Sequence, residues 1–139
     1  KVQEGQEGDF LEEATDFRGR MLGRAMDTTF ELFTPDILIE DTLDLRDYGV
    51  EATAELVGGH TSGALIVKMD SGEVLVGDLI RGGMVRRKKV TLHFFHEDRA
   101  VAHAALRDVL DGGATEVCAA HDRCLEPSRV RRWLDRKER

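Results

Sequence analysis

The sequence predicts an α+β fold, a mostly antiparallel sheet with flanking helices, because helical and strand-like patterns occupy separate blocks of the chain. Residues 9–33 have apolar side chains at helical spacing, and residues 37–76 show short apolar runs and alternation of period two. Residues 98–134 return to helical spacing around one further strand. The 139 residues, 41% hydrophobic and 34% charged, suit one domain of ordinary size.

The first block predicts a helix that ends before Pro35, since the residue preceding a proline avoids helical geometry. Gly19 and Gly23 each weaken this helix by about 1 kcal/mol relative to alanine, so two shorter helices are an alternative. We therefore expect residues 1–35 to form an N-terminal polar segment and a helical insert, with residues 36–139 as the second unit of the chain.

The second block predicts several short strands, at residues 37–39, 43–45, 52–57, 64–69 and 73–76. Asp70-Ser71-Gly72 joins the last two with residues that tight turns prefer, which predicts a hairpin over residues 64–79. Residues 90–95 fit either another short strand or an extended loop.

The last block predicts a helix capped by Asp98 that runs to about Leu110 and ends at Gly112-Gly113. A strand is expected at residues 116–120. Pro127 suits the first position of a terminal helix, because its missing N–H has no partner there in any case. The buried stripe of that helix is expected to consist of Val130, Trp133 and Leu134.

The formal net charge of −7 disfavours a nucleic-acid or anionic-membrane surface, which would need cations to neutralise phosphates. The basic run Arg86-Arg87-Lys88-Lys89 is typical of a solvated loop, and we assign it no function. No apolar stretch approaches the ~20 residues that cross a bilayer, and residues 1–8 lack the apolar centre of a signal peptide. We therefore expect a cytoplasmic protein with no nucleic-acid or membrane partner.

The sequence contains two cysteines, Cys118 and Cys124, which are too few for a disulfide framework. Free thiols in a reducing compartment are therefore expected, with Cys118 as a small buried side chain. A thiolate zinc site with His121, which lies between the cysteines, is a weaker alternative because no second ligand pair exists.

Three metal-capable side chains come at the ends of expected strands. They are His60 in Gly58-Gly59-His60-Thr61-Ser62-Gly63, Asp78 in Val76-Gly77-Asp78, and His121 in Val117-Cys118-Ala119-Ala120-His121. A sheet holds ligands at its strand ends rigidly while their heads project into a cleft, as a metal site requires. One such residue is usually structural, so the ordered set is what indicates a site.

This order resembles the second half of the metallo-β-lactamase superfamily, which runs through a Gly-His-Thr-x-Gly motif, a hairpin ending in Gly-Asp, a helix, and a strand ending in histidine. The motif here is Gly59-His60-Thr61-Ser62-Gly63, with Ser62 where many relatives have proline. The last strand ends in Ala120-His121-Asp122, where relatives usually have Gly-His-Gly. The resemblance covers about residues 36–134 and implies that residues 36–139 form the C-terminal half of an αββα sandwich.

The resemblance implies that His60 binds one metal ion, that His121 binds a second, and that Asp78 bridges them. Zinc is the expected metal, with iron or manganese also suited to nitrogen and oxygen ligands. A His-x-His-x-Asp-His segment supplies the remaining ligands in the superfamily, and this sequence lacks it. Its histidines are His60, His93, His96, His103 and His121, and no two are separated by a single residue.

The resemblance therefore predicts part of a metal-dependent hydrolase that acts on an ester-, thioester-, lactam- or phosphoester-type bond of a small-molecule substrate when the fold is complete. This chain alone is expected to be inactive, with the complementary N-terminal half or a second copy as its partner. The lack of an initiator methionine before Lys1 favours a fragment, although a processed terminus or an omitted disordered segment would leave the same start. The alternative function is a non-catalytic metal-binding or self-associating module that retains half the fold.

The other histidines could form a second cluster, since His96 and His103 would share one face of a helix that began earlier. A zinc helix needs histidines four residues apart, and this spacing is not present. We therefore interpret His96-Glu97-Asp98 as the polar entry of the helix and His103 as a surface or half-buried residue.

Overall fold

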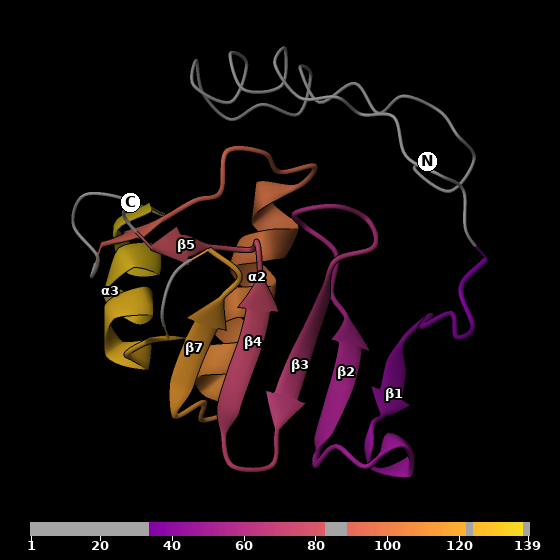
Figure 1. The fold of residues 1–139 in the computed structure, drawn as a ribbon. Helices are drawn as coiled ribbons and strands as arrows, with labels where there is room; N and C mark the ends of the chain where they lie inside the picture. The colour runs from indigo at the N-terminus through magenta and orange to yellow at the C-terminus, as the bar shows by residue number, and fades with distance from the viewer. Residues whose placement is uncertain (1–33, 83–88, 122–123, 138–139) are drawn as a thin grey trace.

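The computed structural model describes residues 34–82, 89–121 and 124–137. Within these ranges a six-stranded sheet carries helices on one side (Figure 1). The helix expected at residues 9–33, and with it the N-terminal unit, lies outside the described residues.

The main sheet has the strand order β1-β2-β3-β4-β7-β8. The strands are β1 (Thr42–Asp44), β2 (Ala52–Leu56), β3 (Leu65–Met69), β4 (Glu73–Gly77), β7 (Glu116–Ala119) and β8 (Cys124–Leu125). A separate two-stranded sheet pairs β5 (Arg81–Gly82) with β6 (Val90–Thr91). All neighbouring strands are antiparallel except β4 and β7, which are parallel, so the sheet is mostly antiparallel as predicted.

The predicted hairpin is formed by β3 and β4, with Val67 opposite Leu75 and the turn at residues 70–72. The prediction of a strand at residues 37–39 is wrong, because these residues pair with no strand among the described residues and the sheet edge starts at Thr42. A 3₁₀ turn, η2 (Arg46–Tyr48), connects β1 to β2. Most of the sheet could therefore be predicted, including the β1 edge expected at residues 43–45, but strand β8 could not.

Helix α2 (Arg99–Asp111) begins where predicted, because the Asp98 carboxylate accepts hydrogen bonds from the backbone N–H groups of Ala100 and Val101 at 2.8 and 3.0 Å. Helix α3 (Pro127–Lys137) starts at the expected proline. Its buried side chains are Val130, Trp133 and Leu134, as predicted.

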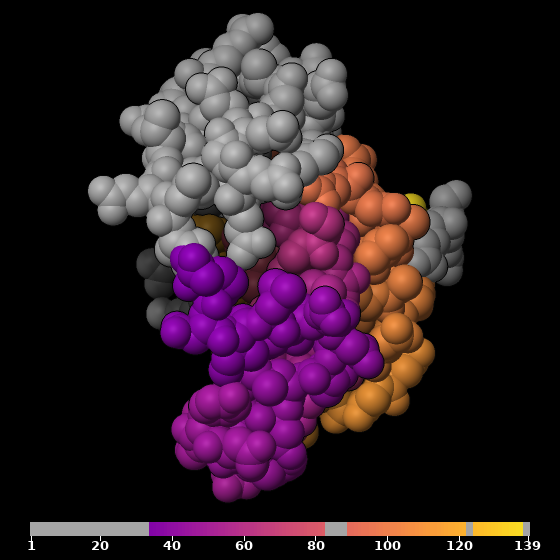
Figure 2. Space-filling view, turned by 90° about the vertical axis from the view of Figure 1, so that its right-hand side faces the viewer, coloured from indigo at the N-terminus to yellow at the C-terminus, as the bar shows by residue number. Residues whose placement is uncertain are grey.

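The core lies between the two helices and one face of the sheet. The buried side chains Ile66, Val76 and Val117 come from the strands, and Leu106 and Leu134 come from the helices. In Figure 1 helix α2 runs behind the strands, and no described helix covers the face toward the viewer. Figure 2 looks onto the β1 edge and shows α2, in orange, along one side of it. The described residues therefore form two layers, one of helices and one sheet, which is half the number of layers in an αββα sandwich.

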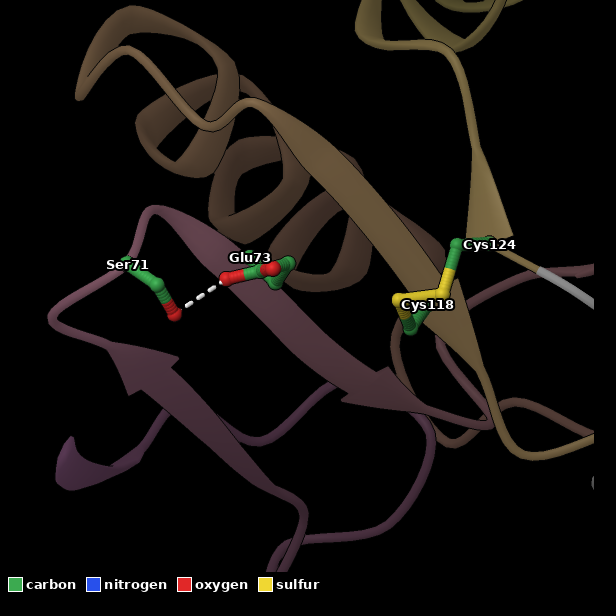
Figure 3. Close-up of a disulfide and its surroundings, with 4 residues drawn as sticks. All are labelled: Ser71, Glu73, Cys118 and Cys124. Carbon is green, nitrogen blue, oxygen red and sulfur yellow. Dashed lines mark hydrogen bonds between the residues drawn. A yellow bond between two sulfur atoms is a disulfide. The ribbon is translucent and has the colours of Figure 1, made fainter. Parts of the chain in front are cut away.

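The two cysteines differ from the expectation of free thiols. Strand β8 follows β7 and pairs with it antiparallel, which sets Cys118 directly opposite Cys124, and the two form a disulfide (Figure 3). The same view shows the hydrogen bond from the Ser71 hydroxyl to the Glu73 carboxylate at the hairpin turn. The prediction failed because no sequence pattern indicates β8, the strand whose pairing with β7 brings the two side chains together.

Among the described residues, no helix has both the length and the apolar character that would allow it to span a bilayer.

Candidate metal centre

Three strand ends meet at one edge of the sheet. Strands β2 and β4 are each antiparallel to β3, so they run in the same direction, and β7 is parallel to β4. Their carboxyl ends therefore lie at the same edge, where the arrowheads of all three point upward in Figure 1. His60, Asp78 and His121 follow these three strands. The topology thus explains why residues 61 positions apart in sequence come together.

Asp78 lies at the centre of the group. Its Oδ2 is 3.9 Å from Nε2 of His60, and its Oδ1 is 3.6 Å from Nε2 of His121. The N–H of Ala120 donates to the carbonyl of Gly77 at 2.9 Å and holds the ends of β4 and β7 together. The structure therefore brings all three residues singled out in the sequence into one cluster, while metal binding by them remains a prediction.

His60 is held in a defined orientation by the loop that precedes α2. Its Nδ1 lies 2.7 Å from the carbonyl oxygen of Phe95. A carbonyl oxygen can only accept, so Nδ1 is the donor, and Nε2 is the nitrogen that faces Asp78. A histidine that ligates a metal through one nitrogen and donates through the other to a carbonyl has this same arrangement.

Gly59 allows the His60 loop to approach the first turn of α2. A Cβ at this position would lie 2.6 Å from the backbone nitrogen of Ala102, and the φ of +93° also favours glycine. The approach is fixed by two hydrogen bonds, from the Asp98 N–H to the Gly59 carbonyl at 2.9 Å and from the Glu97 N–H to the His60 carbonyl at 3.0 Å. Glycine is thus required at position 59 by packing against the helix, whatever the role of His60.

The donor atoms suit a cation. Asp78 Oδ1 is buried and has no hydrogen-bond partner in the described part of the chain. Its separations of 3.6 and 3.9 Å from histidine nitrogens exceed those of ordinary hydrogen bonds, which are about 2.7–3.2 Å. Ligand atoms about 2.0–2.1 Å from a tetrahedral zinc lie roughly 3.3 Å apart, close to the spacing seen here. The donor set of imidazoles and a carboxylate therefore fits zinc, iron or manganese.

His93 also belongs to the cluster, which the sequence did not predict. Its Nε2 lies 3.9 Å from Asp78 Oδ1, and its ring is stacked on that of His121 with the centroids 5.6 Å apart. Arg81 positions the segment after β6, because its Nε donates to the Leu92 carbonyl at 3.3 Å and its guanidinium lies 3.9 Å from the centre of the Phe94 ring. No spacing rule links position 93 to the other residues of the cluster, so only the path of this loop brings His93 to them.

His96 was interpreted as the polar entry of α2, but it is buried, with 5% of its surface exposed. Its ring lies edge-on to that of His60, 5.3 Å between centroids. The pKa of His96 is lowered to about 4, mainly by burial, with the nearby His60 and His93 adding to the shift and the Gly59 backbone opposing it. His96 is therefore neutral at pH 7 and forms an inner wall of the site.

The pKa of His93 is likewise lowered to about 4, mainly by burial and against the opposing effect of Asp78. His60, His121 and Arg81 contribute to the same lowering. A neutral imidazole is the form that binds metal ions. His103 lies elsewhere, edge-on to Trp133 at 5.4 Å.

The disulfide excludes the alternative zinc site. Cys118 and Cys124 are bonded to each other, so neither sulfur is a free thiolate. His121 therefore belongs with Asp78 and His93.

The fold of the described chain is similar to part of the fold of a metallo-β-lactamase superfamily protein. A solved structure similar to it is an archaeal superfamily protein, ST1585 from Sulfolobus tokodaii, with a TM-score of 0.55 and 14% sequence identity. The match covers 96% of this chain and 57% of the archaeal protein, so the chain spans little more than half of that relative's length. No protein-family model and no curated protein matches the sequence.

Proposed function

We propose that this chain is part of a metal-dependent hydrolase, in which the cluster around Asp78 binds the metal. The observation that carries the proposal is the position of the Asp78 carboxylate, with one oxygen facing His60 at 3.9 Å and the other facing His121 at 3.6 Å. A carboxylate that faces histidines on both sides is suited to bridging two ions. The similarity to the archaeal superfamily protein supports this assignment.

A metal ion held there would supply Lewis-acid activation of water and of the scissile carbonyl or phosphoryl group. The residues of this chain contribute orientation and access. The hydrogen bond to Phe95 keeps Nε2 of His60 directed at Asp78, and the buried His96 shields the inner side from water. The side chain of His121 is 66% exposed, so substrate would approach from its side of the cluster.

The proposal assigns the remaining ligands to a second segment that packs on the open sheet face. That face carries Leu65 and Leu75, which are 39% and 44% exposed, respectively. Val67 pairs with Leu75 and is two residues from Leu65, so the side chains point to the same face. The same observation favours the second candidate function, a self-associating module in which another copy of the chain covers these leucines.

Metal content and activity of the purified protein test the proposal. Elemental analysis with intact-mass measurement identifies the ion and the polypeptides that bind it together. The metal-loaded assembly is then tested with ester, thioester, lactam and phosphodiester substrates. Asp78→Asn should lower the hydrolysis rate by at least about 100-fold, since it removes the shared ligand.

The matched control is His103→Gln, which also removes an imidazole but lies against Trp133, outside the cluster. It should retain the wild-type metal content and rate. Hydrolysis that survives both Asp78→Asn and complete metal removal would contradict the proposal. A metal-binding assembly that hydrolyses none of the substrates would favour the non-catalytic module instead.

A further inference from the structure

The carboxylate of Asp78 divides the cluster into two unequal sides. Its Oδ1 faces Nε2 of both His93 and His121, at 3.9 and 3.6 Å, whereas its Oδ2 faces Nε2 of His60 at 3.9 Å. The ligand atoms of Asp78, His93 and His121 all lie within 4.8 Å of one another. One side therefore has three donors from this chain, and the other has two.

The two histidines on the three-donor side are oriented alike. The planes of the His93 and His121 rings differ by 21°, with 5.6 Å between centroids, and both direct Nε2 toward the same carboxylate oxygen. The side chain of His93 is 13% exposed and that of His121 is 66% exposed, so the group is closed on one side and open on the other.

The fold fixes His93 in this place by contacts on both sides of it in the sequence. Strand β6 pairs with β5, Arg81 opposite Thr91, and the Thr91 hydroxyl donates to the Arg81 carbonyl at 3.3 Å. The Phe95 carbonyl, two residues beyond His93, accepts the hydrogen bond from His60. The segment is therefore held on both sides of His93, and preorganisation of this kind strengthens metal binding.

From this geometry we propose that His93 is a metal ligand, and that Asp78, His93 and His121 hold one ion without any residue from outside the chain. The proposal rests on the proposed function and deepens it, because it specifies the three ligands with which this chain binds one ion by itself. Two imidazoles and one carboxylate with an open fourth position form a known catalytic ligand set. His60, on the two-donor side, needs further ligands to hold a second ion.

Zinc affinity of the purified chain, measured by competition with a chelating indicator, tests the proposal. The variant His93→Phe keeps a buried flat ring but removes both nitrogens, and it should weaken binding by at least about 10-fold. The matched control is His103→Gln, which should bind the first zinc ion within about threefold of the wild type, because His103 lies against Trp133, outside the cluster. His60→Asn is the discriminating variant: it removes the donor on the Oδ2 side and should weaken binding of the first ion less than His93→Phe does.

The absorption spectrum of bound Co²⁺ gives a second test, which uses the variant His93→Gln and so does not depend on whether His93→Phe folds. Co²⁺ bound to the wild type should show visible bands that change in shape and intensity in His93→Gln, because one nitrogen ligand is lost. Unchanged bands and unchanged zinc affinity in both His93 variants would overturn the ligand role.

Failure of this proposal is distinguishable from failure of the proposed function. If the wild-type chain binds no ion by itself, the self-contained site is overturned, while the hydrolase function is still judged by the substrate tests on the metal-loaded assembly. If His60→Asn abolishes the first ion and His93→Phe does not, the site is centred on Oδ2 of Asp78, and the assignment to His93 is wrong.

Discussion

The Nδ1 atom of His60 donates a hydrogen bond of 2.7 Å to the carbonyl oxygen of Phe95, 35 residues further along the chain. This contact links the loop after β2 to the segment before α2. It also determines which nitrogen of His60 is available to a metal. Substitutions of His60 can therefore separate the effect of this hydrogen bond from the effect of losing the nitrogen that faces Asp78.

His60→Asn should leave the free energy of unfolding of the metal-free protein within about 0.5 kcal/mol, because its amide nitrogen can replace Nδ1 as the donor to Phe95. His60→Ala should cost about 1–2 kcal/mol, since it removes the hydrogen bond that joins this loop to Phe95. Urea unfolding with a chelator present measures both. Equal destabilisation by the two variants would show that the hydrogen bond contributes nothing.

Gly59→Ala should destabilise the protein by about 2–4 kcal/mol, because the new Cβ would lie 2.6 Å from the backbone nitrogen of Ala102 and the φ is +93°. The displaced loop carries His60, so the geometry of the site should change as well. Gly63→Ala is the matched control, since its added Cβ would meet no atom within 4 Å. Thermal unfolding of both variants decides the matter, and similar melting temperatures would contradict the close approach.

His96 should make the metal-free protein less stable as the pH falls from about 6.5 to 4. Its pKa is near 6.5 in the unfolded chain and about 4 when buried, so the unfolded state binds the proton first. The loss should approach about 3 kcal/mol at pH 4 and level off below it. His96→Gln should remove this part of the pH dependence, as measured by urea unfolding across the range. Parallel profiles for wild type and variant would refute it.

The disulfide should be detectable by thiol counting. Protein that is unfolded without a reductant should contain less than one free thiol per chain, because Cys118 and Cys124 are joined. Cys118→Ser combined with Cys124→Ser should lower the free energy of unfolding by about 2 kcal/mol, the entropic effect of a loop this short. Two reactive thiols in protein purified under non-reducing conditions would show that the bond does not form.

Local chemistry made much of this molecule predictable from sequence. Asp98 was recognisable as a cap because a carboxylate at that place accepts the first free N–H groups of a helix, and Pro127 because it tolerates the first helical position. The hairpin followed from the turn residues between β3 and β4. His60, Asp78 and His121 could be singled out because each follows a strand.

The tertiary structure alone decided which other residues join that group. His93 and His96 lie in an irregular segment, whose path depends on Arg81, on Phe94 and on the hydrogen bond between His60 and Phe95. Likewise the disulfide depends on β8, two residues long, which has no periodicity to detect. Sequence patterns predict helices, strands and the residues that begin or end them, because these depend on interactions between residues close together in the chain. The contents of loops are set by long-range contacts, and here these contacts place His93 beside Asp78.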